Sequence, residues 1–140
     1  MWVQFIKRFL YKNSSLRKVT TMRAIINSTK KSKVSNDYML CRSVSSKALG
    51  LMFSNEAKVR RHALLFEFNK PSIQSMHMFF VFYPIDLIFL DDKKKVVEMK
   101  KRFLPFTTYT PNKMSKYVIE LPSGTITRSK TDVGDTVKWL

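Results

Sequence analysis

Apolar positions follow a strand-like period in the middle of the chain. Apolar and polar side chains alternate over Ala63 to Phe68, which predicts a half-buried β-strand. Both faces are apolar from Met76 to Tyr83, a pattern typical of a strand in the centre of a sheet. Because Pro84 has no N–H to donate to a ladder, we expect the chain to bend there and to continue as a strand over Ile85 to Leu90.

The remaining pattern predicts short elements joined by turns. Strands are expected at 24–26, 95–99, 117–121 and 136–140, a polar hairpin connection at 91–94, short helices at 43–53 and 122–130, and a turn at 133–135. Lys100 to Lys116 shows no sustained period and contains two prolines, so we expect an irregular surface loop. The sequence therefore predicts a mainly β fold, a compact barrel-like or sandwich-like antiparallel sheet with a few short helices.

Length and charge divide the chain into a tail and one domain. The 140 residues, 44% of them hydrophobic, suit a single core, which we place at 22–140. The net charge is +16, but nine Lys and Arg residues precede Asp37, the first acidic residue. The rest of the chain holds 17 basic and 10 acidic residues, a net charge of +7 that many domains carry without binding a polyanion.

Residues 1–21 form a basic amphipathic extension. From Met1 to Leu10 the apolar residues recur at helical spacing, with Lys7 and Arg8 on the other side, so residues 1–12 could make a peripheral contact with an anionic membrane. The alternative is a disordered extension that contributes nothing to the fold. No stretch has the ~18 uninterrupted apolar residues of a transmembrane segment. Cys41, the single cysteine, cannot form an intrachain disulfide, which favours a reducing compartment and a cytoplasmic location.

Several motifs together carry a likeness to a known family. They are Gly50-Leu51-Met52-Phe53, Leu64-Leu65-Phe66-Glu67-Phe68, His77-Met78-Phe79-Phe80-Val81, Pro84 to Asp91, Val96-Val97, Tyr117 to Thr125 and Gly134-Asp135. In this order and spacing, residues 36–140 resemble domain of unknown function 192, in its archaeal type. The resemblance implies a compact, mainly β domain, and it implies no reaction, catalytic residue or cofactor. The chain departs from the family pattern at Ser54, where an Arg is frequent, and at His62-Ala63, where a Gly is frequent.

Candidate chemistry is sparse. His77 and Asp86 could converge if the chain bends at Pro84, and such a pair can orient a base or hold a metal. The structural alternative is that His77 satisfies a backbone group at a strand end and that Asp86 caps a turn or pairs with a basic residue. Cys41 matches no local nucleophile signature, and one Cys with two His residues does not give the ligand spacing of a zinc site. We therefore predict no catalytic residue, metal or cofactor.

Two basic clusters flank one predicted strand. Lys93, Lys94 and Lys95 precede it, and Lys100, Lys101 and Arg102 follow it, close in sequence to Phe106 and Tyr109. Basic groups combined with stacking aromatics can hold single-stranded nucleic acid. The alternative is a solvated hairpin whose lysines protect a sheet edge.

The leading functional hypothesis is a small non-catalytic β module that binds a ligand or a protein partner at one end of the sheet. The 100–116 loop, with His77, Phe106 and Tyr109, is the expected binding region, since long loops on a rigid scaffold commonly carry binding residues. The alternatives are nucleic-acid binding through the tail and the lysine clusters, and an enzyme that uses His77 and Asp86.

Overall fold

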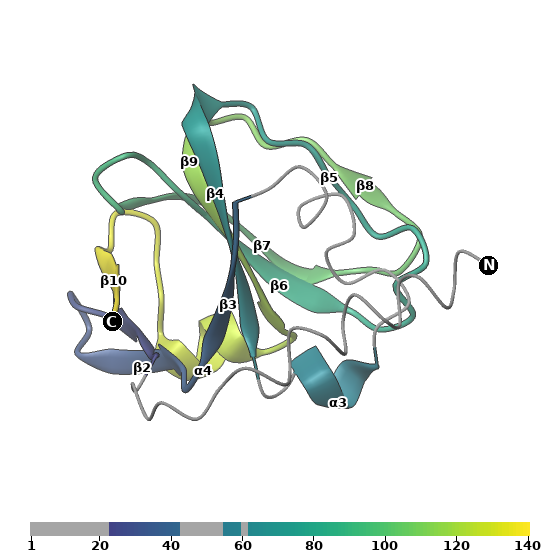
Figure 1. Ribbon diagram of the computed structural model, residues 1–140, viewed down its shortest axis with the longest axis horizontal. Coiled ribbons are helices and arrows are strands. Elements are labelled where there is room, and N and C mark those ends of the chain that lie inside the picture. The colour runs from purple at the N-terminus through teal and green to yellow at the C-terminus, as the bar shows by residue number, and fades with distance from the viewer. Residues whose placement is uncertain (1–22, 43–54, 60–61) are drawn as a thin grey trace.

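The computed structural model describes residues 23–42, 55–59 and 62–140. The extension at 1–21 and the helix expected at 43–53 lie outside these residues. Within the described ranges the chain forms a five-stranded, a three-stranded and a two-stranded sheet (Figure 1). The prediction of a mainly β fold is confirmed.

The five-stranded sheet has the order β3-β4-β9-β6-β7. Its strands are β3 (Tyr38–Cys41), β4 (Ala63–Ser72), β9 (Ser115–Pro122), β6 (Ile85–Leu90) and β7 (Val96–Phe103). The β3–β4 pair is parallel, and the other pairs are antiparallel. Strands β4, β6 and β9 and the hairpin between β6 and β7 were predicted, whereas β3 was not.

Smaller elements complete the fold. The three-stranded sheet joins β10 (Val137–Trp139), β1 (Ile25–Asn27) and β2 (Ser32–Ser35), and the two-stranded sheet pairs β5 (Met76–His77) with β8 (Thr108–Tyr109). The described helices are short, α3 (Glu56–Val59) and α4 (Thr125–Ser129). Helix α4 begins later than the expected Pro122, which is the last residue of β9. Among residues 23–42, 55–59 and 62–140, no helix is long and apolar enough to cross a membrane.

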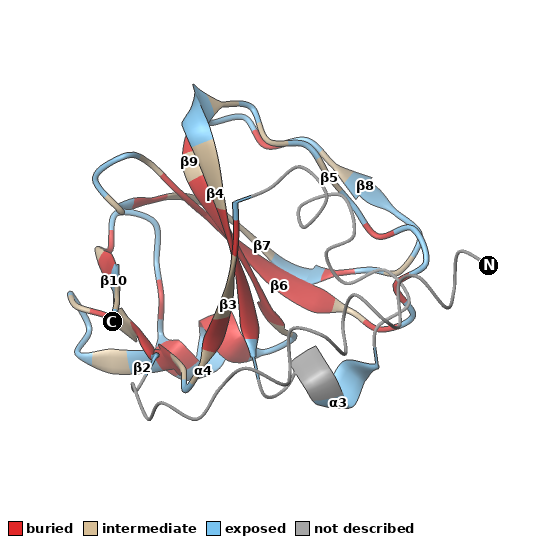
Figure 2. Ribbon diagram, viewed as in Figure 1, coloured by how far each residue is buried: buried red, intermediate tan, exposed pale blue. Residues whose placement is uncertain are grey.

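The five-stranded sheet separates two apolar clusters. Successive residues of a strand point to opposite faces, so Ile119 of β9 joins one cluster and Val118 joins the other. All six residues of β6 are buried, because both faces of this strand are covered (Figure 2). This accounts for the continuous apolar run of β6.

Two predicted elements are corrected by the structure. Met76 to Tyr83 is not a central strand, because β5 ends at His77 and residues 78–84 form turns and irregular backbone. Lys100 to Lys116 is not one irregular loop, because it contains the end of β7, all of β8 and the start of β9. The described strands also form no closed barrel, since β3 and β7 are the two edges of the five-stranded sheet.

A buried polar network joins the first described strand to the C-terminal segment. The Asn27 amide donates to Thr131 Oγ1 at 3.1 Å and to Asp135 Oδ2 at 2.8 Å. The Asp132 N–H donates to the same Asp135 oxygen at 2.9 Å, and the Lys30 ammonium lies 3.2 Å from Asp132. These contacts link segments more than 100 positions apart, so the network has a structural role.

Candidate functional site

Two loops meet at the end of the molecule that carries β5 and β8. The first, 78–84, follows β5, and the second, 104–107, precedes β8. The Met78 N–H donates to Thr107 O at 2.8 Å, and the Phe106 N–H donates back to Met78 O at 2.9 Å. These reciprocal bonds extend the β5–β8 ladder into the loops and hold one against the other.

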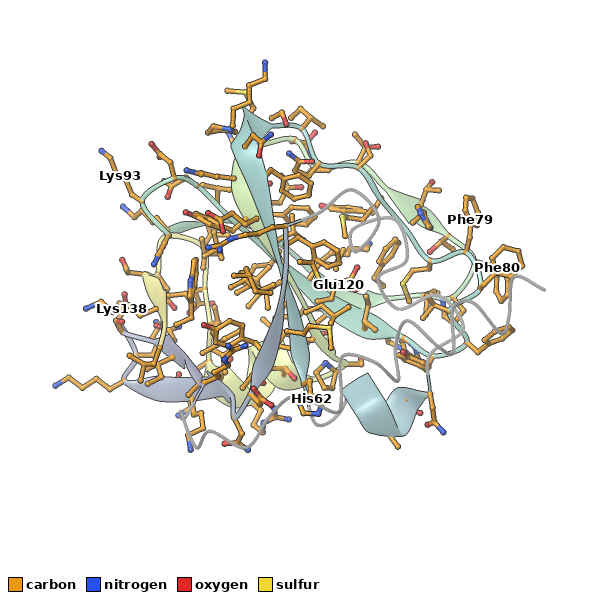
Figure 3. The ribbon with its side chains drawn as sticks, viewed as in Figure 1. His62, Phe79, Phe80, Lys93, Glu120 and Lys138 are labelled. Carbon is orange, nitrogen blue, oxygen red and sulfur yellow. The ribbon has the colours of Figure 1, made fainter. Side chains whose placement is uncertain are left out.

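Large apolar side chains on these loops face solvent. Phe79, Phe80, Phe82, Leu104 and Phe106 are between 46% and 65% exposed, and we call them the aromatic patch. In Figure 3, Phe79 and Phe80 lie at the outer edge of the molecule and point away from its body. Clusters of exposed apolar side chains of this kind commonly mark interaction surfaces.

The buried residues of the first loop explain why its phenylalanines face outward. Met78, Val81 and Tyr83 are buried and belong to the apolar cluster on one face of the five-stranded sheet. Their side chains anchor the loop, which leaves Phe79, Phe80 and Phe82 on the solvent side. The three phenylalanines of the first loop are thus carried on a segment that is itself fastened to the core.

The rings of the patch contact one another at defined angles. Phe106 packs edge-on against Phe82, with ring centroids 5.3 Å apart, and against Phe80, at 6.3 Å. His77 stacks on Phe79 at 5.1 Å. Phe80 and Phe106 have φ angles of 57° and 58°, a left-handed conformation that bulky residues rarely adopt. Such outliers are often found at functional sites, where surrounding contacts hold them in place.

Glu98 of β7 fastens the chain that follows β8. Its Oε1 accepts a hydrogen bond of 2.5 Å from the Tyr109 hydroxyl, and its Oε2 accepts the N–H groups of Asn112 at 2.8 Å and Lys113 at 3.0 Å. The Tyr109 ring packs against Phe103 at 6.2 Å. The bond to Glu98, then burial and the negative charge of Glu98, raise the pKa of Tyr109 to about 12. Tyr109 therefore links β8 to β7 through Glu98.

The structure places His77 and Asp86 in different environments. His77 is exposed, and its Nδ1 accepts the N–H of Phe79 at 3.4 Å. Asp86 is buried, and its two oxygens accept the N–H groups of Arg102 at 3.0 Å and Ile126 at 2.9 Å. The two side chains share no hydrogen bond or ion pair among the described contacts. Asp86 thus matches the structural alternative, since it ties β7 and the start of α4 to β6.

The two basic clusters are separated along β7. Lys93, Lys94 and Lys95 precede this strand, and Lys100, Lys101 and Arg102 are its fifth to seventh residues, so Lys95 and Lys100 are five residues, roughly 17 Å, apart. Within the first cluster, the Lys94 ammonium lies 3.9 Å from the centre of the Trp139 ring. Within the second, Lys100 lies 5.1 Å from the centre of the Tyr109 ring, while Lys101 and Arg102 are exposed. Only the second cluster is close in sequence to the aromatic patch.

Glu120 on β9 is a buried carboxyl that the sequence reading did not single out. It lies opposite Leu64 of β4 and Leu87 of β6, and its Oε2 has no hydrogen-bond partner. Burial raises the pKa of Glu120 to about 8. A lone acid between apolar strand residues was the available signal, since Val118 and Glu120 must share a face.

The described residues give little basis for metal or thiol chemistry. They contain no group of three or more His, Cys, Asp or Glu side chains that could hold a metal ion. Cys41 is buried, and its Sγ donates to Met39 O at 3.9 Å. The His62 Nδ1 lies 2.7 Å from Asp37 Oδ2.

Sequence reasoning located part of the patch. Phe106 was predicted as a binding residue and belongs to it, and His77 contacts it through Phe79. Phe79, Phe80 and Phe82 were missed, because an apolar run does not distinguish buried positions from exposed ones. The usable signal was the nearby proline, which favours turns over a regular strand.

Comparisons with known proteins give a consistent result. The family model DUF192, described as "Uncharacterized ACR", matches residues 25–139. A UPF0127 protein of Pyrococcus abyssi is 36% identical over 121 residues, covering 85% of this chain and 99% of that protein. A UPF0127 protein of Pyrococcus horikoshii is 34% identical over 118 residues, covering 83% and 98%.

A solved structure is similar to this chain at the level of fold. It is a protein of unknown function from Novosphingobium aromaticivorans, with a TM-score of 0.74 and 22% identity, and the match covers 89% of this chain and 91% of that one. The family resemblance in the sequence is thus confirmed by the family model and by relatives matched over nearly their whole length. The chain belongs to the DUF192 family.

Proposed function

We propose that the protein is a non-catalytic binding module and that the aromatic patch is its binding surface. The main support is that five large apolar side chains are exposed together on two loops, which reciprocal backbone hydrogen bonds hold against each other. These side chains are Phe79, Phe80, Phe82, Leu104 and Phe106. A surface held in one conformation loses little entropy when it binds, so preorganisation favours affinity. The fully buried Asp86 and the exposed His77 make an enzyme that uses this pair the weaker hypothesis.

The left-handed Phe80 and Phe106 support this proposal. A non-glycine residue in this conformation costs roughly 1–2 kcal/mol relative to right-handed backbone. Folding alone gives no reason to place large apolar rings at two strained and exposed positions. A binding role gives one, because strain fixes the direction in which each ring projects. We also propose a cytoplasmic location, since Cys41 is the single cysteine of the chain and cannot form an intrachain disulfide.

A titration with octyl sulfate below its micellar concentration tests the proposal. This probe joins an apolar chain to an anion, so it can bind both the exposed rings and the basic residues beside them without forming a bilayer. The titration is followed by amide NMR on the full chain. The amide signals of residues 78–82 and 104–107 should shift first. The double variant Phe82→Ser/Phe106→Ser should lose these shifts, while Val133→Ser should keep them, because Val133 is 61% exposed but lies outside the patch. Equal shifts in all three proteins would reject the patch as a binding surface.

A further inference from the structure

The end of the molecule that carries the aromatic patch is basic. Lys100, Lys101 and Arg102 lie shortly before the loop that carries Leu104 and Phe106. The carboxylate nearest to them in sequence, Glu98, accepts hydrogen bonds from backbone N–H groups, as does Asp86. Lys101 and Arg102 are exposed and make no ion pair with a described residue. They lie two and three residues before Leu104 in the sequence, so cationic groups are close to exposed apolar side chains. A partner complementary to this surface combines apolar groups with negative charge.

The size of the patch distinguishes between two such partners. A stable protein–protein interface uses about 20–30 residues on each side. The aromatic patch has five residues on two neighbouring loops, and Phe79 and Phe80 project from the outer edge of the molecule (Figure 3). A few projecting apolar side chains with adjacent cations are enough for a segment to enter the headgroup boundary of a bilayer.

Ring geometry argues against single-stranded nucleic acid as the partner. Bases stack on open aromatic faces. In the patch, Phe106 meets Phe80 at 73° and Phe82 at 75°, so these rings pack edge-on into one cluster. Phe79 already has His77 stacked against it. The arrangement presents a compact apolar tip and not a row of stacking platforms.

We infer that the partner of the aromatic patch is the surface of an anionic phospholipid bilayer. The inference rests on the proposed function and names its partner. Phe79, Phe80, Phe82 and Phe106 enter the boundary between headgroups and acyl chains, while Lys101 and Arg102 remain at the level of the lipid phosphates. Anionic lipids attract each basic residue near the surface, and apolar burial then holds the tip in place.

Cosedimentation of the full chain with vesicles tests the inference. One set of vesicles contains phosphatidylglycerol and phosphatidylcholine in equal parts, and the other contains phosphatidylcholine alone. Phe82→Ser/Phe106→Ser removes apolar area, and Lys101→Gln/Arg102→Gln removes two charges beside the patch. Lys93→Gln/Lys138→Gln is the matched charge control, because both lysines are exposed and lie at the opposite end of the molecule (Figure 3).

The expected result is stronger binding to the anionic vesicles, which weakens as salt is raised. Each patch variant should weaken this binding about tenfold, and the charge control by less than about threefold. Vesicle binding that is absent, or equal in all variants, overturns the inference. If the octyl sulfate shifts remain patch-dependent in that case, the proposed function survives and its partner is not a membrane.

Two further probes complete the test. One is a twelve-residue peptide of alternating Glu and Leu, and the other is an oligothymidylate of similar length. Patch-dependent binding to either of them without vesicle binding overturns the membrane inference and identifies the correct class of partner. Loss of patch dependence for every probe, octyl sulfate included, rejects the proposed function together with the inference.

Discussion

The Tyr109 hydroxyl donates a hydrogen bond of 2.5 Å to Glu98 Oε1, which ties β8 to β7. The other carboxylate oxygen accepts two backbone N–H groups from the chain after β8. One side chain therefore fixes both the strand and the connection that continue from the loop carrying Phe106. The aromatic patch depends on this anchor, because β8 pairs with β5, which leads into the other loop.

The first prediction concerns this anchor. Tyr109→Phe removes the hydroxyl and should lower the free energy of unfolding by about 1 kcal/mol, the usual net value of one hydrogen bond. In the parent chain, absorbance at 295 nm should show one tyrosine that ionises near pH 12, since the pKa of Tyr109 is raised to about 12. This late phase should be missing in Tyr109→Phe. A late phase that persists in the variant would assign it to another tyrosine.

The second prediction concerns the pH dependence that Glu120 produces. Its pKa is raised from 4.5 to about 8 by burial. Between these values the unfolded chain has lost the proton and the folded chain keeps it, so stability falls as pH rises. The total loss is on the order of 3–5 kcal/mol and is complete above pH 8.

Glu120→Gln tests this dependence by urea unfolding at pH 5 and pH 8. The variant should lose much less stability between these pH values than the parent chain does. Glu67→Gln is a suitable control, because Glu67 is partly exposed and pairs with Arg42. An equal loss in the parent and in Glu120→Gln would show that another group is responsible.

The third prediction concerns Asp135, whose effect has the opposite sign. Burial would raise the pKa of Asp135, but the Asn27 amide, the Asp132 N–H and the Lys30 charge outweigh it and lower the pKa. A lowered pKa gives stability that is present above the ordinary value of 3.8 and lost as pH falls through the folded value.

Asp135→Ala should cost about 1–3 kcal/mol at pH 7, because the buried Asn27 amide loses one of its acceptors. The cost should shrink at pH 3, where the parent chain loses part of the same contribution. Thermal unfolding of the parent chain and of Asp135→Ala at both pH values measures this loss of stability. A cost that is the same at pH 3 and pH 7 would contradict an ionised Asp135 as the source.

The fourth prediction separates the aromatic patch from the core. Phe106→Gly should leave the free energy of unfolding unchanged or raise it by up to about 1 kcal/mol, because glycine relieves the left-handed backbone. Met78→Ala should cost about 2–5 kcal/mol, because Met78 is 1% exposed and anchors the first loop. Urea unfolding compares the two. A large cost for Phe106→Gly would mean that the ring belongs to the folding core.

Sequence reasoning found the strands whose burial is simple. β6 and β9 lie in the middle of the sheet, and all six residues of β6 are buried. Their sequences are therefore rich in apolar residues, which made both strands predictable. β7 was predicted to end at Met99 but runs to Phe103. Its later residues are charged because it is an edge strand, and polar residues at a strand end look the same as those of a loop.

The patch was hard to predict for a different reason. The exposure of Phe79 and Phe80 depends on a turn after Met78, in which Phe80 takes a positive φ. That turn is held by bonds to Thr107 and Phe106, almost 30 positions later. Tertiary contacts of this kind leave no local signal in the sequence, so the apolar run from Met76 to Tyr83 was assigned to a strand. The short parallel strand β3 was missed because its pairing with β4 is likewise non-local.

The most direct test of the central claim is the position of the amide shifts caused by octyl sulfate in the full chain. Our account predicts that the earliest and largest shifts fall at 78–82 and 104–107, and that Phe82→Ser/Phe106→Ser removes them while Val133→Ser does not. Shifts that begin in the three-stranded sheet around β10, and that are unchanged in the patch variant, would contradict it.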